Sequence, residues 1–184
     1  TDVVEVPGVE TAILDITDLA AVRTMVSQND VDVIVNCAAY TAVDRAEEEQ
    51  ANADAVNWLA VENMARVAAR NDVALIHIST DYVFDGTKHK PYNESDPTAP
   101  INYYGASKLR GEEAVRESGC RGVVIRVQWL YSPYGKNFVK TMLRLAEQQR
   151  EVRVVADQRG CPTSADDLAE AIVAILPEVV ADNT

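Results

Sequence analysis

A tyrosine and a lysine four residues apart could form a proton-donating pair. Tyr104 and Lys108 lie in a stretch with helical periodicity, and this spacing places their β-carbons on one face, about 6 Å apart. A free tyrosine has a pKa of about 10 and is a poor acid–base catalyst at neutral pH. A nearby ammonium lowers that pKa, so the pair could protonate a developing alkoxide. The same spacing also occurs on many solvated helices, which is the structural alternative.

A hydroxyl at the end of a predicted strand could support this pair. Residues 73–79 form a short apolar run typical of a buried strand, and Thr80 follows it directly. From that position the Thr80 hydroxyl could bond the carbonyl oxygen that Tyr104 protonates. Its alternative role is that of a turn-forming hydroxyl.

Strands and helices alternate along the chain. The predicted strands span residues 32–37, 73–79 and 122–128, with weaker candidates over 152–156 and 12–16. A first helix is predicted from the helical spacing of Leu19, Val22 and Val26, after a capping candidate at Thr17. Further helices are predicted over residues 53–71, 102–118, 137–149 and 165–176. This order predicts parallel βαβ units and an α/β fold with a doubly wound, Rossmann-like parallel sheet. Such folds bind ligands at the carboxyl ends of the strands, where the non-periodic stretch 80–100 would lie.

Composition excludes several classes of protein. The formal net charge of −12 argues against nucleic acid and anionic membranes as partners, because both require clustered Lys and Arg. No apolar run approaches the ~18 residues of a membrane span, and no signal peptide opens the chain. Cys37, Cys120 and Cys161 are widely spaced, which favours reduced thiols in a cytoplasmic protein over a disulfide framework or a metal site. His77 lies within an apolar run, where a structural role is favoured.

Several stretches together resemble the extended short-chain dehydrogenase/reductase family. They run in the family's order across nearly the whole chain: Val35–Asp44, Ser79–Gly86, Tyr104–Lys108, Trp129–Tyr131 and Asp157–Thr163. Within that family the chain is similar to the dTDP-4-dehydrorhamnose reductases. The resemblance implies reduction of the 4-keto group of dTDP-4-dehydro-L-rhamnose to dTDP-L-rhamnose, with NADPH or NADH as cofactor. It also implies a possible homodimer and, through the family alone, possible use of Mg²⁺.

The resemblance also implies roles for individual residues. Tyr104 would donate the proton, Lys108 would lower its pKa and hold the nicotinamide ribose, and Thr80 would orient the keto oxygen. The further cofactor contacts would be Asp2, Asp15, Ile16, Ala38, Ala39 and Tyr40. The substrate contacts would be Thr80, Asp81, Tyr82 and Trp129. A solvated terminal charge is the alternative for Asp2, and a core anchor beside the sheet is the alternative for Trp129.

The sequence departs from the family at both ends. It lacks the G-x-x-G-x-x-G loop that cradles the cofactor pyrophosphate, and it stops before most of the smaller substrate-binding lobe. We therefore expect residues 1–184 to form a single partial NAD(P)-binding domain, truncated at the N-terminus, with elements of the substrate lobe near 130–165. We also expect a shortened form of a longer protein, with weak or no turnover by itself.

Two other functions remain open on the sequence. The same fold can serve as a non-catalytic regulatory subunit, as in the β subunit of methionine adenosyltransferase. The presence of Thr80, Tyr104 and Lys108 together favours an enzyme over that alternative. A nucleotide-sugar epimerase or dehydratase is the other possibility, but Tyr82 stands where dehydratases usually carry a second acidic residue after the threonine.

Overall fold

The structure, a computed structural model, describes residues 1–6 and 8–181. They divide into two compact units, which are described separately. The first unit comprises Thr1–Arg126 and the end of the chain from Val179, and the second comprises Val127–Glu178. No helix in the described residues is both long and apolar enough to cross a membrane.

The first unit is built on a three-stranded sheet in the order β1-β2-β3. The strands are β1 (Val33–Asn36), β2 (Ala74–Thr80) and β3 (Gly122–Val127), which confirms the three principal strand predictions. β1 and β2 pair in parallel, from Val33 opposite Ala74 to Asn36 opposite His77. The carboxyl ends of both strands therefore lie at the same edge of the sheet, where the predicted site residues follow them.

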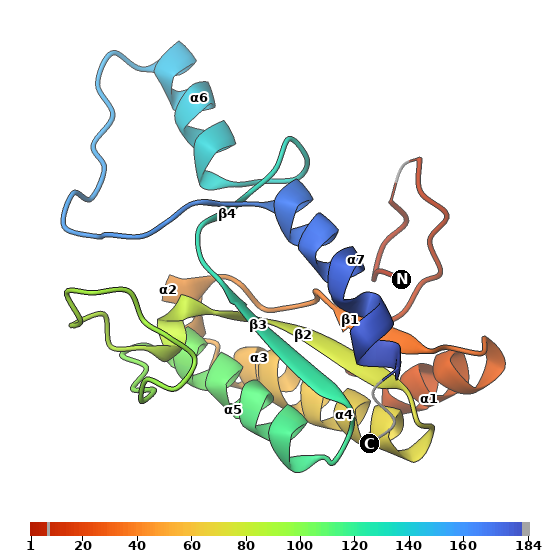
Figure 1. The fold of residues 1–184 in the computed structure, drawn as a ribbon. Coiled ribbons are helices and arrows are strands. Elements are labelled where there is room, and N and C mark those ends of the chain that lie inside the picture. Colours follow the sequence, from red (N-terminus) through yellow and green to blue (C-terminus); the bar gives the residue numbers. More distant parts are fainter. Residues whose placement is uncertain (7, 182–184) are drawn as a thin grey trace. The chain divides into compact units, whose positions relative to one another are not determined.

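Helices cover one face of this sheet. Figure 1 shows α4 (Ala60–Arg70) and α5 (Tyr103–Glu117) running along it, with α1 (Leu19–Gln28) beside α4. Their apolar sides meet β2 in a core that includes Val61, Met64, Leu75 and Val115. This core holds β2 and α5 in fixed register, and these two elements carry Thr80, Tyr104 and Lys108.

The helical segment before β2 is longer and less regular than predicted. It begins with α2 (Val43–Ala46) and α3 (Gln50–Asp54) and continues through a π-helix, η1 (Ala55–Leu59), into α4. A π-helix inserts one wider turn into an α-helix and often marks a functional site. Here it turns the Asn57 side chain into the interior of the unit.

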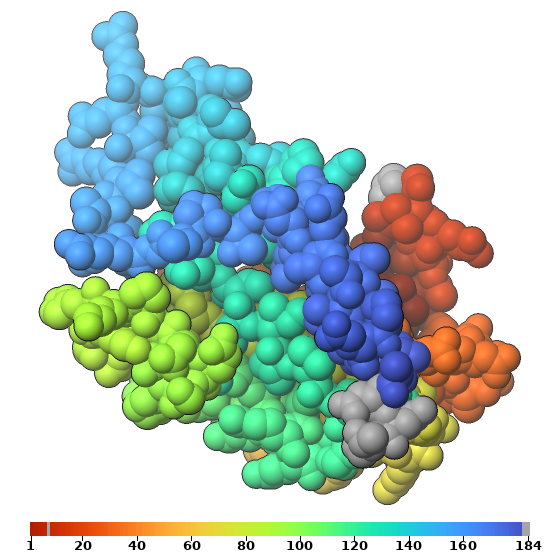
Figure 2. All heavy atoms as spheres, in the orientation of Figure 1, coloured from red at the N-terminus to blue at the C-terminus, as the bar shows by residue number. Residues whose placement is uncertain are grey.

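The segment between β2 and α5 has little regular structure, as predicted. After the short 3-10 helix η2 (Asp81–Val83), no helix or strand forms before Tyr103. The rings of Phe84 and Tyr92 stack with centroids 4.2 Å apart, and the amide of Ala99 donates to the Val83 carbonyl. Figure 2 shows the atoms of this segment, in yellow-green, gathered in a lobe.

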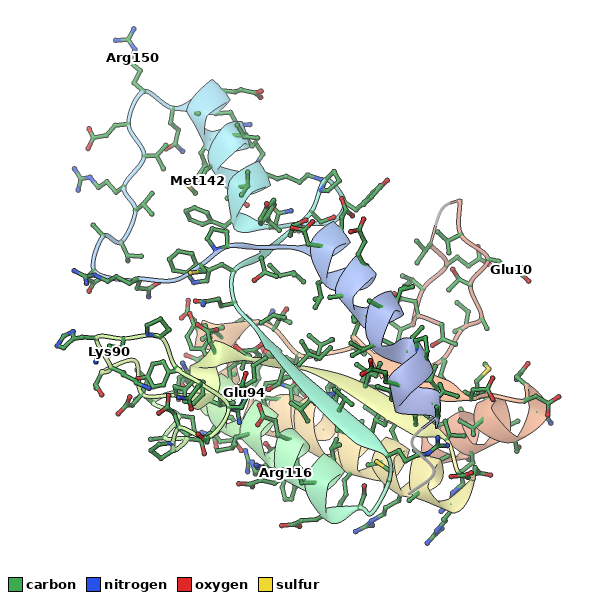
Figure 3. All side chains as sticks on the ribbon, in the orientation of Figure 1. Glu10, Lys90, Glu94, Arg116, Met142 and Arg150 are labelled. Atoms are coloured by element: carbon green, nitrogen blue, oxygen red, sulfur yellow. The ribbon has the colours of Figure 1, made fainter. Side chains whose placement is uncertain are left out.

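The second unit contains two short parallel strands and two helices. These are β4 (Leu130–Tyr131), β5 (Thr163–Ser164), α6 (Phe138–Gln148) and the greater part of α7 (Ala165–Ala181). Met142, labelled in Figure 3, lies on α6, a helix without a single buried residue. Both helices confirm predictions, although α7 continues through Pro177 beyond the predicted end at residue 176.

Three local predictions were wrong. Residues 152–156 form no strand, because this β-branched run is largely exposed and no strand of the described residues pairs with it. Residues 12–16 contribute a single parallel bridge, between Asp2 and Ile13, in place of a strand. The first helix is capped by Asp18, whose carboxylate accepts from the amides of Ala20 and Ala21, while the Thr17 hydroxyl donates to Asp15.

Candidate active site

The first turn of α5 is held against the end of β2. The Asn102 side chain accepts from the Gly105 amide at 2.7 Å, and Glu47 Oε1 accepts from the Tyr103 amide at 2.8 Å. Both bonds satisfy amides that a helix N-terminus leaves without partners. Gly105 allows the helix to touch η2, because a β-carbon there would lie 2.2 Å from the Tyr82 carbonyl oxygen.

Tyr104 projects from this turn into a cluster of aromatic and small side chains. Its ring meets the Tyr82 ring edge-on, with centroids 5.8 Å apart, and only 9% of the residue is exposed. Burial raises the pKa of Tyr104, and the neighbouring Thr80 side chain opposes that rise. Thr80 and Tyr104 therefore converge as predicted, although they lie on separate elements.

The pKa of Tyr104 is shifted in the direction opposite to the one expected from Lys108. We expected the ammonium to lower the pKa of the phenol, but that pKa is raised, and burial is the largest cause. The Lys108 Nζ instead donates to the Ile78 carbonyl at 2.6 Å and lies 3.3 Å from His77 Nε2. The Tyr104 phenol thus keeps its proton through the neutral range, which is the form that a proton donor requires.

Lys108 is itself strongly affected by its surroundings. It is 1% exposed, and burial lowers its pKa to about 8, while the neighbouring Glu112 carboxylate and Cys37 side chain oppose that shift. Near pH 8 this amine therefore changes between its charged and neutral forms. A lysine with such a perturbed pKa beside a strand end is typical of a functional site.

A buried carboxylate follows one turn after Lys108. Glu112 accepts three hydrogen bonds from the Arg126 guanidinium on β3: Nε donates to Oε1 at 2.9 Å and to Oε2 at 3.2 Å, and Nη2 donates to Oε2 at 2.6 Å. It also accepts from the Ser79 hydroxyl, at the end of β2. A charge this deeply buried is tolerated because it is paired and hydrogen-bonded. The same helix becomes exposed at Arg116, as Figure 3 shows.

The segment after β1 is fixed by a side chain from the π-helix. Asn57 is fully buried; its Oδ1 accepts from the Tyr40 amide at 2.8 Å, and its Nδ2 donates to the Tyr40 carbonyl at 3.0 Å. The same Nδ2 donates to the Ser107 hydroxyl on α5, also at 3.0 Å. Asn57 therefore connects the backbone of the predicted cofactor-binding segment to the helix that carries Tyr104 and Lys108.

These residues fit the nicotinamide end of a dinucleotide cofactor. Ala38 is exposed and Ala39 half-buried at the carboxyl end of β1, so their small side chains leave the backbone open to a planar group. Lys108 supplies a hydrogen-bond donor nearby. The sequence offers no glycine-rich loop for the pyrophosphate, so the fit extends to one end of the cofactor only.

Asp81 and Tyr82 lie in η2, directly after Thr80. The Thr80 hydroxyl donates to Asp81 Oδ1 and accepts from the Tyr82 amide, both at 3.2 Å. Thr80 therefore also caps this short helix, which was its structural alternative. Burial raises the pKa of the Asp81 carboxyl. The two residues therefore lie beside Thr80 and Tyr104.

The remaining predicted site residues lie apart from this group. Asp2 pairs with the backbone around Ile13, and Asp15 accepts from the amide and hydroxyl of Thr17, which lowers the pKa of its carboxyl. Ile16 packs against the main apolar core. Within the described chain, none of their side chains bonds to Thr80, Tyr104 or Lys108.

Trp129 belongs to the second unit. It is 43% exposed and has a positive φ of 48°, so it is not the buried anchor that was its structural alternative. Gly160 lies against its ring, because a β-carbon on Gly160 would approach Trp129 to 2.9 Å. A contact between Trp129 and a sugar nucleotide stays a prediction.

Sequence reasoning missed four residues that organise the site: Asn57, Glu112, Arg126 and Asn36. Glu112 had a usable signal, because it continues the spacing of four residues from Tyr104 and Lys108 along one helical face. Asn57 had none, since the π-helix that turns it inward was not apparent in the sequence.

Known proteins of similar sequence and structure agree with this geometry. A protein of Sinorhizobium fredii named dTDP-4-dehydrorhamnose reductase is 52% identical over 153 residues, which cover 83% of this chain and 52% of that protein. The crystal structure of dTDP-4-dehydrorhamnose reductase from Bacillus anthracis in complex with NADP matches with a TM-score of 0.88 and 43% identity. That match covers 90% of this chain and 59% of the other.

A second solved structure, the dTDP-4-dehydrorhamnose reductase ortholog of Clostridium acetobutylicum, matches with a TM-score of 0.86 and 40% identity. That match covers 90% of this chain and 59% of the Clostridium acetobutylicum chain. The chain spans about half the length of the first curated relatives that it matches. The family model described as RmlD substrate binding domain matches residues 2–184. The chain therefore belongs to the RmlD substrate binding domain family.

Proposed function

We propose that this chain supplies the proton donor and the carbonyl-binding groups of an NAD(P)H-dependent reductase. The substrate would be dTDP-4-dehydro-L-rhamnose, whose 4-keto group becomes the hydroxyl of dTDP-L-rhamnose. The observation that carries the proposal is the buried Tyr104 phenol beside Thr80 at the end of β2. Lys108 lies one helical turn further along α5. The names of the relatives support the choice of substrate.

The reaction adds a hydride to the carbonyl carbon and a proton to its oxygen. The nicotinamide, when bound, supplies the hydride and is oxidised. The Thr80 hydroxyl turns from Asp81 to the substrate oxygen and donates a hydrogen bond that strengthens as negative charge develops. The Tyr104 phenol then transfers its proton to that oxygen. The raised pKa of Tyr104 keeps this proton in place until the alkoxide forms.

The proposal extends to the cofactor and to the rest of the protein. NADPH is favoured over NADH by the NADP complex of the Bacillus anthracis relative. Ala38, Ala39 and Tyr40 would line the nicotinamide end, and Asp2, Asp15 and Ile16 would lie toward the adenosine. Residues 1–184 would form a partial NAD(P)-binding domain with elements of the substrate lobe near 130–165.

A homodimer and Mg²⁺ enter the proposal through the family resemblance alone, and a cytoplasmic location enters it through the three widely spaced cysteines. In the described part of the chain, no three His, Cys, Asp or Glu side chains are grouped so as to hold a metal ion. No step of the proposed reaction uses a metal. The substrate groups would be Thr80, Asp81, Tyr82 and Trp129.

The proposal can be tested in a chimera. Residues of this chain would replace the matching stretch of the Sinorhizobium fredii relative, and NADPH oxidation would be followed with dTDP-4-dehydro-L-rhamnose. We expect turnover, and we expect Tyr104→Phe to reduce it by about 10²–10⁴-fold, because the proton donor is lost. Cofactor affinity should remain nearly unchanged.

Tyr103→Phe is the matched control, since it removes a hydroxyl one residue away that bonds to Asp54 at 2.7 Å. It should change turnover by no more than a few fold. A chimera that folds and binds NADPH but does not reduce the ketone would overturn the proposal. So would a Tyr104→Phe chimera with unchanged turnover. A regulatory subunit would fold and bind NADPH without reducing the ketone.

A further inference from the structure

A buried line of hydrogen bonds leads from the backbone after β1 to Lys108. The Ala38 amide donates to Asn36 Oδ1 at 3.1 Å, and Asn36 Nδ2 lies 3.0 Å from His77 Nδ1. His77 Nε2 in turn lies 3.3 Å from Lys108 Nζ. Asn36 and His77 face each other across the β1–β2 pair, and both are buried.

The direction of this line is fixed at its first member. A backbone amide can only donate, so the atom of Asn36 facing Ala38 must be the oxygen. The amino group of Asn36 then faces His77 Nδ1 and donates to it. A ring nitrogen that accepts a hydrogen bond carries no proton, so neutral His77 must be protonated on Nε2.

This tautomer determines what Lys108 meets. The Nε2–H of His77 points at Lys108 Nζ, and an ammonium has three donors and no acceptor. Two donors therefore face each other while Lys108 is charged. A neutral amine has a lone pair that accepts from Nε2–H, and it still donates to the Ile78 carbonyl at 2.6 Å. The hydrogen-bond polarity thus favours the neutral form of Lys108.

We propose that Asn36 and His77 are positioning residues. Asn36 holds His77 as its Nε2–H tautomer, and His77 in that form biases Lys108 toward the neutral amine. The inference rests on the proposed function, because the role of Lys108 in reduction is part of that proposal. Its consequence is that Lys108 loses its charge at a lower pH than that at which Tyr104 loses its proton.

The other groups around Lys108 are consistent with this arrangement. His77 faces it from β2, Cys37 from the end of β1, and Glu112 from the next turn of α5. Glu112 would favour the charged amine, but its carboxylate is engaged by Arg126 from β3. Burial lowers the pKa of Lys108 to about 8 and, together with the charge of Lys108, lowers that of His77 to about 3. His77 is therefore neutral at every pH at which Lys108 titrates.

The tautomer can be read directly from the full 184-residue chain. In a ¹⁵N-histidine-labelled sample, long-range ¹H–¹⁵N spectra distinguish a protonated ring nitrogen from a bare one. We expect His77 to show a bare Nδ1 and a protonated Nε2 from about pH 6 to pH 9. This window lies above the lowered pKa of His77 and includes the lowered pKa of Lys108. A protonated Nδ1 with a bare Nε2 would overturn the proposal.

A double-mutant cycle tests the effect on Lys108. Asn36→Asp is isosteric and still accepts from the Ala38 amide, but it presents an acceptor to His77 Nδ1. It should reverse the tautomer, let Nε2 accept from the ammonium, and raise the pKa of Lys108 by about one unit or more. The pKa would be followed by ¹³C NMR of the lysine side-chain carbons.

The new carboxylate also attracts the ammonium directly, so the same change is made in a His77→Phe background. In that background we expect the pKa of Lys108 to rise by less than half as much. An equal rise in both backgrounds would show that His77 transmits nothing, and the proposal would fail. If His77→Phe does not fold, the ring-nitrogen spectra of the wild type and of Asn36→Asp still decide. None of these measurements involves turnover, so they can fail while the proposed reductase activity holds, and the reverse.

Discussion

At the scale of single residues, burial governs the chemistry of this site. The pKa of Tyr104 is raised and that of Lys108 is lowered, and in both the largest cause is removal from water. Desolvation penalises the charged form of any group, so it moves acids and bases in opposite directions. The phenol and the amine are thereby both shifted toward their neutral forms, in contrast to the lowered tyrosine pKa that their spacing suggested.

The buried His77 should make the chain sensitive to acid. Its folded-state pKa of about 3 lies below the ordinary value of 6.5, so below pH 6.5 the unfolded chain binds a proton that the folded chain excludes. The free energy of unfolding should fall by up to about 1.4 kcal/mol per pH unit as the pH drops from 6.5 toward 4, with no contribution above pH 7.

Urea denaturation at several pH values would measure this slope. His77→Gln should flatten it, because the amide does not titrate, whatever its effect on stability at pH 7. His89→Gln changes an exposed histidine and should leave the slope as in the wild type. Equal slopes for the wild type and His77→Gln would contradict the prediction.

At the scale of elements, α5 is positioned by the closeness of its approach to its neighbours. Gly105 lets its first turn touch η2, and Gly111 lets its middle touch the π-helix η1, where a β-carbon would lie 2.3 Å from the Asn57 carbonyl oxygen. Both contacts are with backbone atoms, which cannot move aside as a flexible side chain can. The register of Tyr104 and Lys108 over β2 therefore depends on two glycines.

Gly111→Ala should destabilise the chain, although alanine gains about 1 kcal/mol over glycine in a helix interior. The clash with the Asn57 backbone should lower the free energy of unfolding by about 2–3 kcal/mol, as overpacking of a core does. Chemical denaturation followed by far-UV circular dichroism would measure it.

Gly119→Ala provides the comparison, because Gly119 has a φ of 75° and a β-carbon there would meet open space. It should cost only about 1 kcal/mol of left-handed backbone strain. If Gly111→Ala proves as mild as Gly119→Ala or milder, the close approach of α5 to η1 is not needed for stability.

At the scale of the whole molecule, the two units differ in how much they bury. The first has a continuous core that includes one side of α4, and nearly every residue of β2 is buried. In the second, the described residues include one buried hydrophobic side chain, Ile172, and α6 has none. Because an isolated helix of this length is marginal in water, α6 has little to stabilise it within its own unit.

Amide hydrogen exchange should reveal this difference. Peptides from β2 and α4 should exchange most slowly, and peptides from α6 should exchange close to the rate of an unfolded chain. Mass spectrometry of the full chain after short labelling times would measure both, and α5 provides an internal helical control with a buried face. Protection of α6 equal to that of α5 would contradict the prediction.

The sequence by itself determined the elements and the main reactive residues of the first unit. The apolar runs at β1, β2 and β3 and the helical spacing of α5 are local patterns, because strand and helix periodicities are set by the backbone. For the same reason Tyr104 and Lys108 were placed correctly on one helix and Thr80 at a strand end.

Only the tertiary structure decided how those residues behave. The direction of the Tyr104 pKa shift, the contact of Lys108 with His77, and the hold of Asn57 on the segment after β1 all depend on groups far apart in the sequence. The same is true of the run at 152–156, which forms no strand because no strand in the described part of the chain pairs with it. Burial and pairing are properties of the assembled chain, and no local pattern of residues encodes them.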